Sequence, residues 1–438
     1  MALLPASSVL RPWSREIPAL IGVLALAFLV GYWHHSHSRY ALLLAALPLL
    51  VVMWLRPHLS LMASVAVLPF LGLTLLTGGV QVPASDVLLS IAFLGALVHL
   101  LLNPEWRGRA RDLRLILLSA APFTTWLLVE VVVHESLFVT FNILQNMQLY
   151  LLPLLVGGLV IRQRRDARVV VGLFVVATLL LVGWWVASGG ESWLTGNKNP
   201  VGQFLANAAL LVFALASSWR WRLLLVPLVL GMLFVQSRGA LVGLGVGIIC
   251  LVVVRGLGGW RRTLAAVVPM VAVVVIGYQV LPEDVTSRST DFSVGNAGTE
   301  LTGLTAAQYS VRMREIYREE GWELIAQNPV FGVGPGNYRT GTPGGLDFTE
   351  DPHNVVIRTA GDLGYPGLIT FGVLLAGTAY VAFQRRKVNP YATVAIAVQA
   401  AIITHSFLDV YWVRGTPVLA FLLIGMAVNR RLDEPRHD

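Results

Sequence analysis

Two short polar stretches in an otherwise apolar chain carry reactive side chains. The first is His353-Asn354, which is followed by Gly364 and Gly367. A neutral imidazole exists near neutral pH, so His353 is suited to take a proton as a general base. The second is Arg238, which lies between two apolar runs with no acidic neighbour in sequence. Such a charge is costly without a partner, and a guanidinium binds phosphate oxygens through its planar fork of donors.

The composition of the chain excludes a water-soluble fold. Of its 438 residues 56% are hydrophobic and 13% are charged, and its mean hydropathy is +0.70. Apolar runs of about 17–20 residues recur, which is long enough for a helix to cross a bilayer. We therefore predict an all-α polytopic membrane protein with about 14, alternatively 12, transmembrane helices. The expected spans are 17–33, 40–54, 59–77, 86–102, 115–134, 141–161, 168–188, 201–218, 222–235, 239–254, 263–281, 360–383, 391–408 and 412–429.

The basic residues orient these spans. With both termini cytoplasmic, most Lys and Arg fall on cytoplasmic loops, as the positive-inside rule requires. The predicted domains are transmembrane helices over 1–281 (about eleven spans), a long loop domain over 282–354 outside the cytoplasm, and 355–438 with about three spans and a short cytoplasmic tail. Because the charges lie between spans, the net charge of +8 does not indicate a nucleic-acid partner. Basic residues on short loops of the opposite side are functional candidates: Arg39, Lys198, Arg238 and Arg414.

The long loop has predicted structure of its own. A helix is expected from Thr305, with Gln308 completing a capping box, and it stops at Asn328-Pro329. A glycine-rich turn follows over 331–338. This turn is not a dinucleotide fingerprint, because no strand precedes it and no helix opens at its end. It brings backbone close either to packed neighbours or to a ligand.

Together these motifs resemble the O-antigen ligase and polymerase superfamily. The resemblance rests on His353-Asn354, nine residues, Gly364, two residues and Gly367, on the preceding stretch Asn328 to Asn337, on Gln236-Ser237-Arg238-Gly239-Ala240, and on Asn197-Lys198-Asn199-Pro200. It implies a multi-pass protein of the Gram-negative inner membrane whose long loop and active site face the periplasm. It also implies inverting, metal-independent transfer of O-antigen polysaccharide from undecaprenyl pyrophosphate to lipid A–core, without a cofactor.

Under this resemblance each candidate residue receives an expected role. Arg238 binds the donor pyrophosphate, with Lys198 and Arg312 as co-ligands, because arginine stabilises the charge that grows on the leaving group. His353 is the catalytic base for the acceptor hydroxyl. The residues expected to position the substrate or the loop are Asn354, Gly334, Gly336, Asn337 and Arg339, and those expected to allow close helix packing are Gly364 and Gly367.

Several alternatives remain open from the sequence. An O-antigen polymerase shares the donor but extends a lipid-linked chain, and a protein O-oligosaccharyltransferase acts on pilin or another protein. Asp347, Glu350 and Asp351 would hold a divalent cation if the reaction used one. A proton-coupled lipid or saccharide transporter would use His405 and Asp409, which share a helix face. The other polar residues within expected spans are Glu130, Gln145 and Gln148, and His34-His35-Ser36-His37 indicates an interfacial loop.

Overall fold

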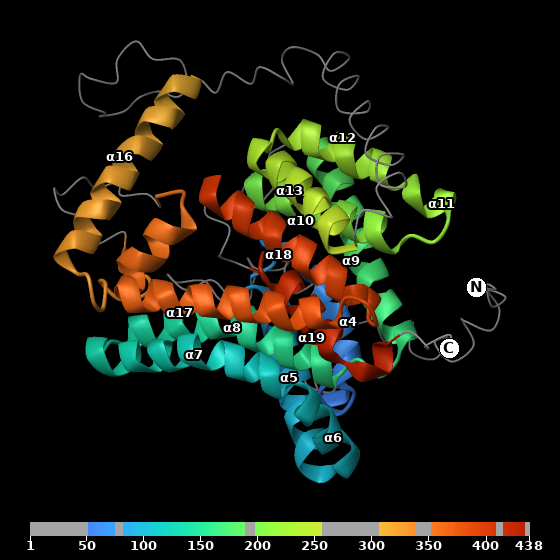
Figure 1. Cartoon of the computed structure of the whole chain (residues 1–438). Coiled ribbons are helices and arrows are strands. Elements are labelled where there is room, and N and C mark those ends of the chain that lie inside the picture. The colour runs from blue at the N-terminus through green and yellow to red at the C-terminus, as the bar shows by residue number, and fades with distance from the viewer. Residues whose placement is uncertain are drawn as a thin grey trace, which may run out of the picture.

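The computed structural model describes residues 51–74, 82–188, 198–255, 306–338, 352–408 and 415–433. Regular structure in these ranges is helical, apart from an isolated bridge between Thr74 and Pro83. The α-helices are α4 Pro57–Val67, α5 Ala84–Leu102, α6 Pro104–Asp112, α7 Arg114–His134, α8 Leu137–Leu159, α9 Arg164–Ala187, α10 Lys198–Leu215, α11 Trp219–Arg222, α12 Leu225–Val235, α13 Arg238–Arg255, α16 Ala306–Gln327, α17 Val355–Arg385, α18 Pro390–Leu408 and α19 Val418–Val428 (Figure 1).

Seven of these helices are long and apolar enough to cross a membrane. They are α5, α7, α8, α9, α13, α17 and α18, and three shorter apolar helices accompany them. The all-α membrane class is therefore confirmed. The total of 14 or 12 spans stays a prediction, because the expected spans 17–33 and 263–281 lie outside the described residues.

Two elements differ from the sequence prediction. Within the described part of the expected span 59–77, the helix reaches only Val67, because Pro69 has no backbone N–H to continue the helix ladder. The stretch 103–114, read as a basic loop, contains the helix α6 instead. Its start has proline at the first helical position, where no backbone donor is needed, and Trp106 buries its ring against the bundle.

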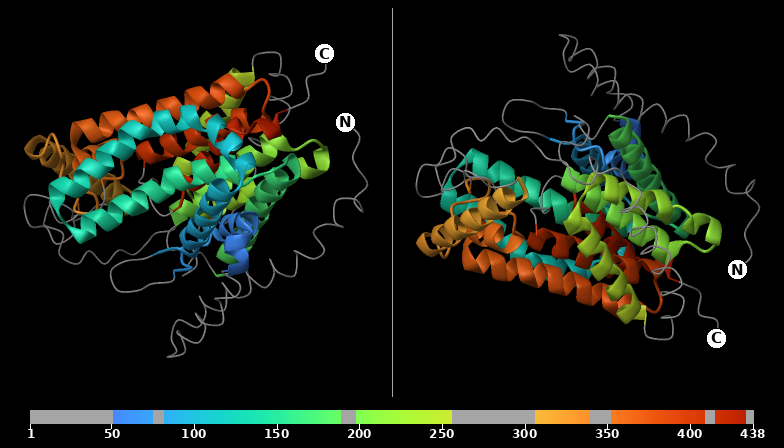
Figure 2. Two further views of the ribbon diagram at one scale, coloured as in Figure 1. Left: turned by 90° about the horizontal axis from the view of Figure 1, so that it is seen from below. Right: turned by 90° about the horizontal axis from the view of Figure 1, so that it is seen from above.

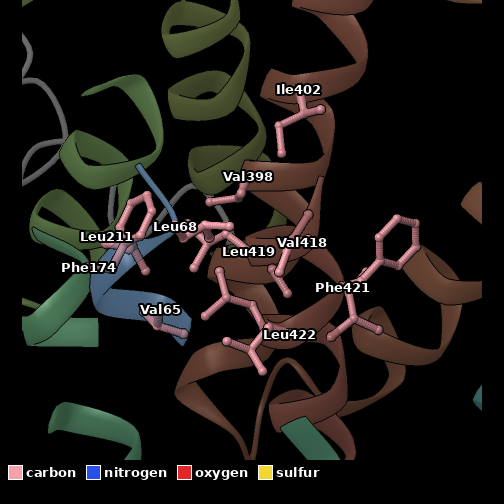
Figure 3. Close-up of a cluster of buried hydrophobic side chains, with 14 of the residues drawn as sticks. Val65, Leu68, Phe174, Leu211, Val398, Ile402, Val418, Leu419, Phe421 and Leu422 are labelled. Carbon is pink, nitrogen blue, oxygen red and sulfur yellow. The ribbon is translucent and has the colours of Figure 1, made fainter. Parts of the chain in front are cut away.

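The helices pack in two groups, and α18 lies between them because it packs on α17 and α19 of the first group and on α10 and α13 of the second. In the first group α7, α8 and α17 run side by side, with α19 packed on α8 (Figure 2). In the second group α13 packs on α18 and α10 packs on α12 and α13. The short helix α19 is buried along its whole length, as expected of a helix that is apolar on every face. Figure 3 shows the central core, to which α4, α9, α10, α18 and α19 contribute Val65, Phe174, Leu211, Val398, Ile402, Leu419 and Phe421.

Charged residues tie helices together at one end of the bundle. Arg109 on α6 donates to the carbonyl of Leu159 at the end of α8, at 2.9 Å. Arg431, just after α19, and Arg109 both bind Glu105, and these bonds lower the pKa of that carboxyl. Arg385 at the end of α17 pairs with Asp433. The opposite end carries α16 and the starts of α13 and α17, so the sequence motifs gather away from these basic contacts (Figure 1).

Candidate functional site

His353 and Asn354 directly precede α17, and Asn354 is its N-cap residue. The Asn354 side chain caps the helix, accepting from the backbone N–H groups of Val356 at 2.9 Å and Ile357 at 3.3 Å. Its amide also donates to the carbonyl of Phe407, in the last turn of α18, at 3.3 Å. His353 has a φ of 50°, in the left-handed region that non-glycine residues rarely adopt. One asparagine therefore fixes both the helix start and its attachment to α18, and His353 precedes it in a constrained conformation.

Gly364 is where α17 departs from helical geometry. Its φ is 69° and its ψ is −178°, and an added Cβ would lie 2.0 Å from the carbonyl oxygen of Val330. The indole of Trp126 on α7 donates to the carbonyl of Leu363 at 2.9 Å, which satisfies an acceptor beside the kink. A Cβ at Gly367 would lie 2.9 Å from the same indole nitrogen. Gly364 thus lies where Val330, just before the glycine-rich turn, approaches α17 closely, and Gly367 lies where α7 does.

The glycine-rich turn lies on α17. Its glycines Gly332, Gly334 and Gly336 have φ values of 63°, 87° and 92°, conformations that suit glycine. The N–H of Val333 donates to the carbonyl of Gly361 at 2.9 Å, and that of Gly334 donates to the carbonyl of Asp362 at 3.0 Å. These donors are consequently used within the protein.

The other side of the turn meets the α7–α8 corner. A Cβ at Gly334 would lie 3.1 Å from the ring of His134, and one at Gly336 would lie 2.5 Å from the amide of Asn142. Asn337 donates its side-chain amide to the carbonyl of Val333 at 3.0 Å. The sequence allowed the turn to approach either packed neighbours or a ligand, and these contacts are with packed neighbours. The turn therefore packs between the α7–α8 corner and α17.

A buried polar cluster lies under the turn, and the sequence reading identified only one of its members. Glu130, flagged as a polar residue within a span, is 0% exposed and meets His134 at 2.9 Å. On α17, Arg358 pairs with Asp362 at 2.6 Å and lies 5.3 Å from the ring of Tyr338. The missed residues His134, Arg358 and Asp362 had a sequence signal, because both pairs have the i, i+4 spacing of helix ion pairs.

Arg238 is the first residue of α13, and its side chain is exposed. The chain breaks between α12 and α13 at Gln236, whose φ is 54°. The next residue along, Gly239, touches the imidazole of His405 in the last turn of α18, where an added Cβ would lie 2.5 Å from Nε2. The Arg238 and His353 motifs therefore contact the same turn of α18.

Lys198 begins α10, next to the start of α13. One turn further on, a Cβ at Gly202 would lie 2.6 Å from the hydroxyl of Ser237, the residue before Arg238. The backbone starts of α10 and α13 are therefore neighbours. The side chain of Lys198 lies outside the described residues.

Arg312 stands apart from this arrangement. It lies in the first half of α16, whose one end extends away from α17 (Figure 1), is exposed, and pairs with Glu315 at 3.1 Å. The helix itself runs Ala306–Gln327, as the sequence predicted within a residue, and packs on α17 through Leu324 and Ile325. The candidates outside the described residues are Arg39, Arg339, Asp347, Glu350, Asp351, Asp409 and Arg414. Within the described part of the chain, no three metal-ligating side chains gather.

The site is thus a membrane bundle with paired helix starts, a constrained histidine and an exposed arginine at one end. A multi-pass helical membrane protein is the class that these features define. Residues 223–372 match the family model described as O-antigen ligase, and the matched region includes both Arg238 and His353. The match supports the assignment to the O-antigen ligase superfamily. No curated protein matches the chain.

Proposed function

We propose that this protein is an O-antigen ligase, which transfers O-antigen polysaccharide from undecaprenyl pyrophosphate to a sugar hydroxyl of lipid A–core. The family match supports function of the ligase and polymerase type. The observation that carries the finer proposal is the contact of two motifs with one helix turn. Asn354 binds the last turn of α18 and Gly239 abuts His405 in the same turn, so His353 and Arg238 flank a shared support.

The donor half of the reaction needs a cation rather than an acid. A lipid pyrophosphate carries its own leaving group, so the enzyme must bind two phosphates and stabilise the charge that grows as the anomeric bond breaks. An exposed arginine at a helix start suits this role, because its planar fork and the helix N-terminus both attract anions. Arg238 is therefore the proposed pyrophosphate ligand, with Lys198 on the neighbouring helix start as its partner. The predicted contribution of Arg312 requires this residue to approach from α16, because it stands apart and pairs with Glu315.

The acceptor half needs a base. A sugar hydroxyl has a pKa far above neutrality, and a positioned imidazole accelerates its attack. His353 is the proposed base, and the side chain of Asn354 caps the helix that begins directly after it. Attack by a single displacement inverts the anomeric carbon, and no divalent metal is required for it. We place this chemistry at the periplasmic face of the inner membrane.

The experiment that tests this proposal varies the acceptor. Purified protein in lipid nanodiscs receives lipid-linked O-antigen together with lipid A–core, with a second lipid-linked chain, or with pilin. Extension of lipid A–core supports the ligase. Extension of the second lipid-linked chain identifies a polymerase, and extension of pilin a protein O-oligosaccharyltransferase. A preparation of His353→Ala serves as the negative control. Transport of the lipid-linked donor without transfer would support the transporter class instead.

A further inference from the structure

The last turn of α18 is the structural link between the two halves of the proposed site. Its Phe407 carbonyl accepts from the Asn354 amide at 3.3 Å, which attaches it to the start of α17. Two residues earlier, the ring of His405 lies against Gly239 at the start of α13. This turn therefore contacts both the residue after Arg238 and the residue after His353.

His405 is built into this turn without rotational freedom. It is 1% exposed, and its Nδ1 lies 2.5 Å from Oε1 of Gln203 on α10. Since an amide oxygen only accepts, Nδ1 carries the proton and donates it. Gln203 in turn donates to Oδ1 of Asn207 at 2.7 Å, and both residues are fully buried. This chain of bonds fixes the plane of the imidazole and links α10 to α18 behind α13.

The ring fills the space that a side chain at position 239 would take. A Cβ on Gly239 would lie 2.3 Å from Cδ2 and 2.5 Å from Nε2 of His405. On the other flank, Ser237 is buried against Gly202 of α10. The start of α13 is therefore packed between α10 and α18. We expect the position of Arg238, its first residue, to depend on the volume and orientation of the His405 imidazole.

We propose that His405 is a positioning residue, which sets the Arg238 end of α13 relative to the His353 end of α17. The inference rests on the proposed function, because Arg238 and His353 act on one reaction there. His405 does not touch substrate in this role. Its effect is geometric, and a misplacement of about 1 Å costs on the order of 10²-fold in rate.

The first experiment separates the hydrogen bond from the ring volume. His405→Asn keeps a donor near the position of Nδ1, whereas His405→Phe keeps the ring and loses the donor. We expect His405→Phe to reduce transfer at saturating substrates by about 10²-fold, and His405→Asn to recover part of that loss. Gln399→Leu is the matched control, since Gln399 is also buried on α18 and binds Thr378 at 3.1 Å away from α13. Equal losses in His405→Phe and Gln399→Leu would overturn the inference.

The second experiment measures geometry without catalysis. Spin labels are placed at Arg238→Cys and Thr359→Cys in a Cys250→Ser background, and the distance distribution between them is recorded with His405, with His405→Phe and with Gln399→Leu. A shifted or broadened distribution in His405→Phe alone supports positioning. An unchanged distribution overturns it, whatever happens to transfer. If the distribution changes but the parent protein transfers no polysaccharide to any acceptor, the proposed function fails and the positioning role stands.

A size exchange keeps the inference testable if His405→Phe does not fold. Gly239→Ala introduces a methyl group where the imidazole lies, so it should reduce transfer on its own. Combined with His405→Asn, whose side chain is smaller, it should regain activity relative to Gly239→Ala alone. A double variant that is less active than either single variant would show that the two positions act independently, and would overturn the inference.

Discussion

The indole nitrogen of Trp126 donates to the carbonyl oxygen of Leu363 at 2.9 Å, across 237 residues of sequence. The bond lies beside Gly364, where α17 leaves helical geometry, and the same indole stacks on Phe331 of the glycine-rich turn with an interplanar angle of 4°. A single tryptophan on α7 therefore supports both the kink and the turn that lies on it.

Gly364→Ala should destabilise the protein severely. The added Cβ would meet the Val330 carbonyl at 2.0 Å, and φ of 69° is unfavourable for alanine. We expect a loss of more than about 3 kcal/mol, seen as a lower thermal unfolding temperature in detergent or as loss of folded protein. Gly372→Ala, in the same helix with nothing within 4 Å, should be neutral or stabilising. Similar unfolding temperatures for both variants would contradict this account of the kink.

Both termini should be cytoplasmic and residues 283–352 should be periplasmic. The prediction follows from the segregation of Lys and Arg, and the described ion pairs gather basic residues of α6, α17 and the chain after α19 at one end. Reporter fusions after Gly295 and at the C-terminus measure the two sides. A cytoplasmic signal after Gly295 would reverse the orientation and remove the proposed site from the periplasm.

Arg238→Ala should abolish transfer, and Arg238→Lys should restore only part of it, because a point charge does not replace the guanidinium fork. The measurement is polysaccharide transfer by folded protein in nanodiscs. Arg255→Lys at the other end of α13 is the matched control, since Arg255 donates to the carbonyl of Ala214 away from the proposed site. Near-normal turnover by a folded Arg238→Ala variant would leave Arg238 as a membrane-surface anchor only.

His353→Ala should reduce the rate by about 10²–10⁴-fold, the contribution of a positioned base, while binding of the undecaprenyl-linked donor persists. His353→Gln can hold a hydrogen bond but cannot take the proton, so it should also be inactive. His99→Gln should retain activity, because His99 lies in the last turn of α5, away from the proposed site. If His353→Gln keeps most activity at saturating donor and acceptor, His353 positions the acceptor and another group is the base.

Transfer should persist in excess EDTA. The motivation is the set of basic candidates at the proposed site, which supply the charge stabilisation that a cation would otherwise provide. The assay compares untreated protein, protein in EDTA, and EDTA followed by magnesium or manganese. Loss of transfer in EDTA with recovery on adding metal would shift the mechanism to Asp347, Glu350 and Asp351.

The helical class and most described span positions followed from hydropathy alone. Runs such as 115–134 and 391–408 match α7 and α18 within one residue, because a helix in lipid needs a long apolar stretch and little else. The break after Val67 was missed although Pro69 marks it, since an apolar window averages over a proline. The helix α6 was missed because its apolar content is confined to Trp106, and its packing depends on partners distant in sequence.

Some residues of the candidate site could likewise be predicted from the sequence, and others could not. Arg238 and His353 were identified because a charged or titratable group stands out against apolar sequence. His134 and Asp362 were not, because their significance comes from the turn that packs between them, and no local pattern states which loop lies on which helix. Asn354 was predicted to position the substrate or the loop, which stays a prediction. Its side-chain oxygen also caps α17, and its side-chain amide donates to the carbonyl of Phe407. The capping signal was present in the sequence, since asparagine is favoured at helix starts.

The two polar pairs of α7 and α17 also bear on how the protein is made. Glu130 meets His134, and Asp362 meets Arg358, in each case four residues away on the same helix. Each helix thus carries a polar partner for its own carboxyl group, and the cost of bringing that group into hydrocarbon is reduced before any neighbour arrives. During biosynthesis α7 emerges long before α17, and it can enter the bilayer without waiting for that later partner. Assembly of the two helices then requires only close packing and the turn between them.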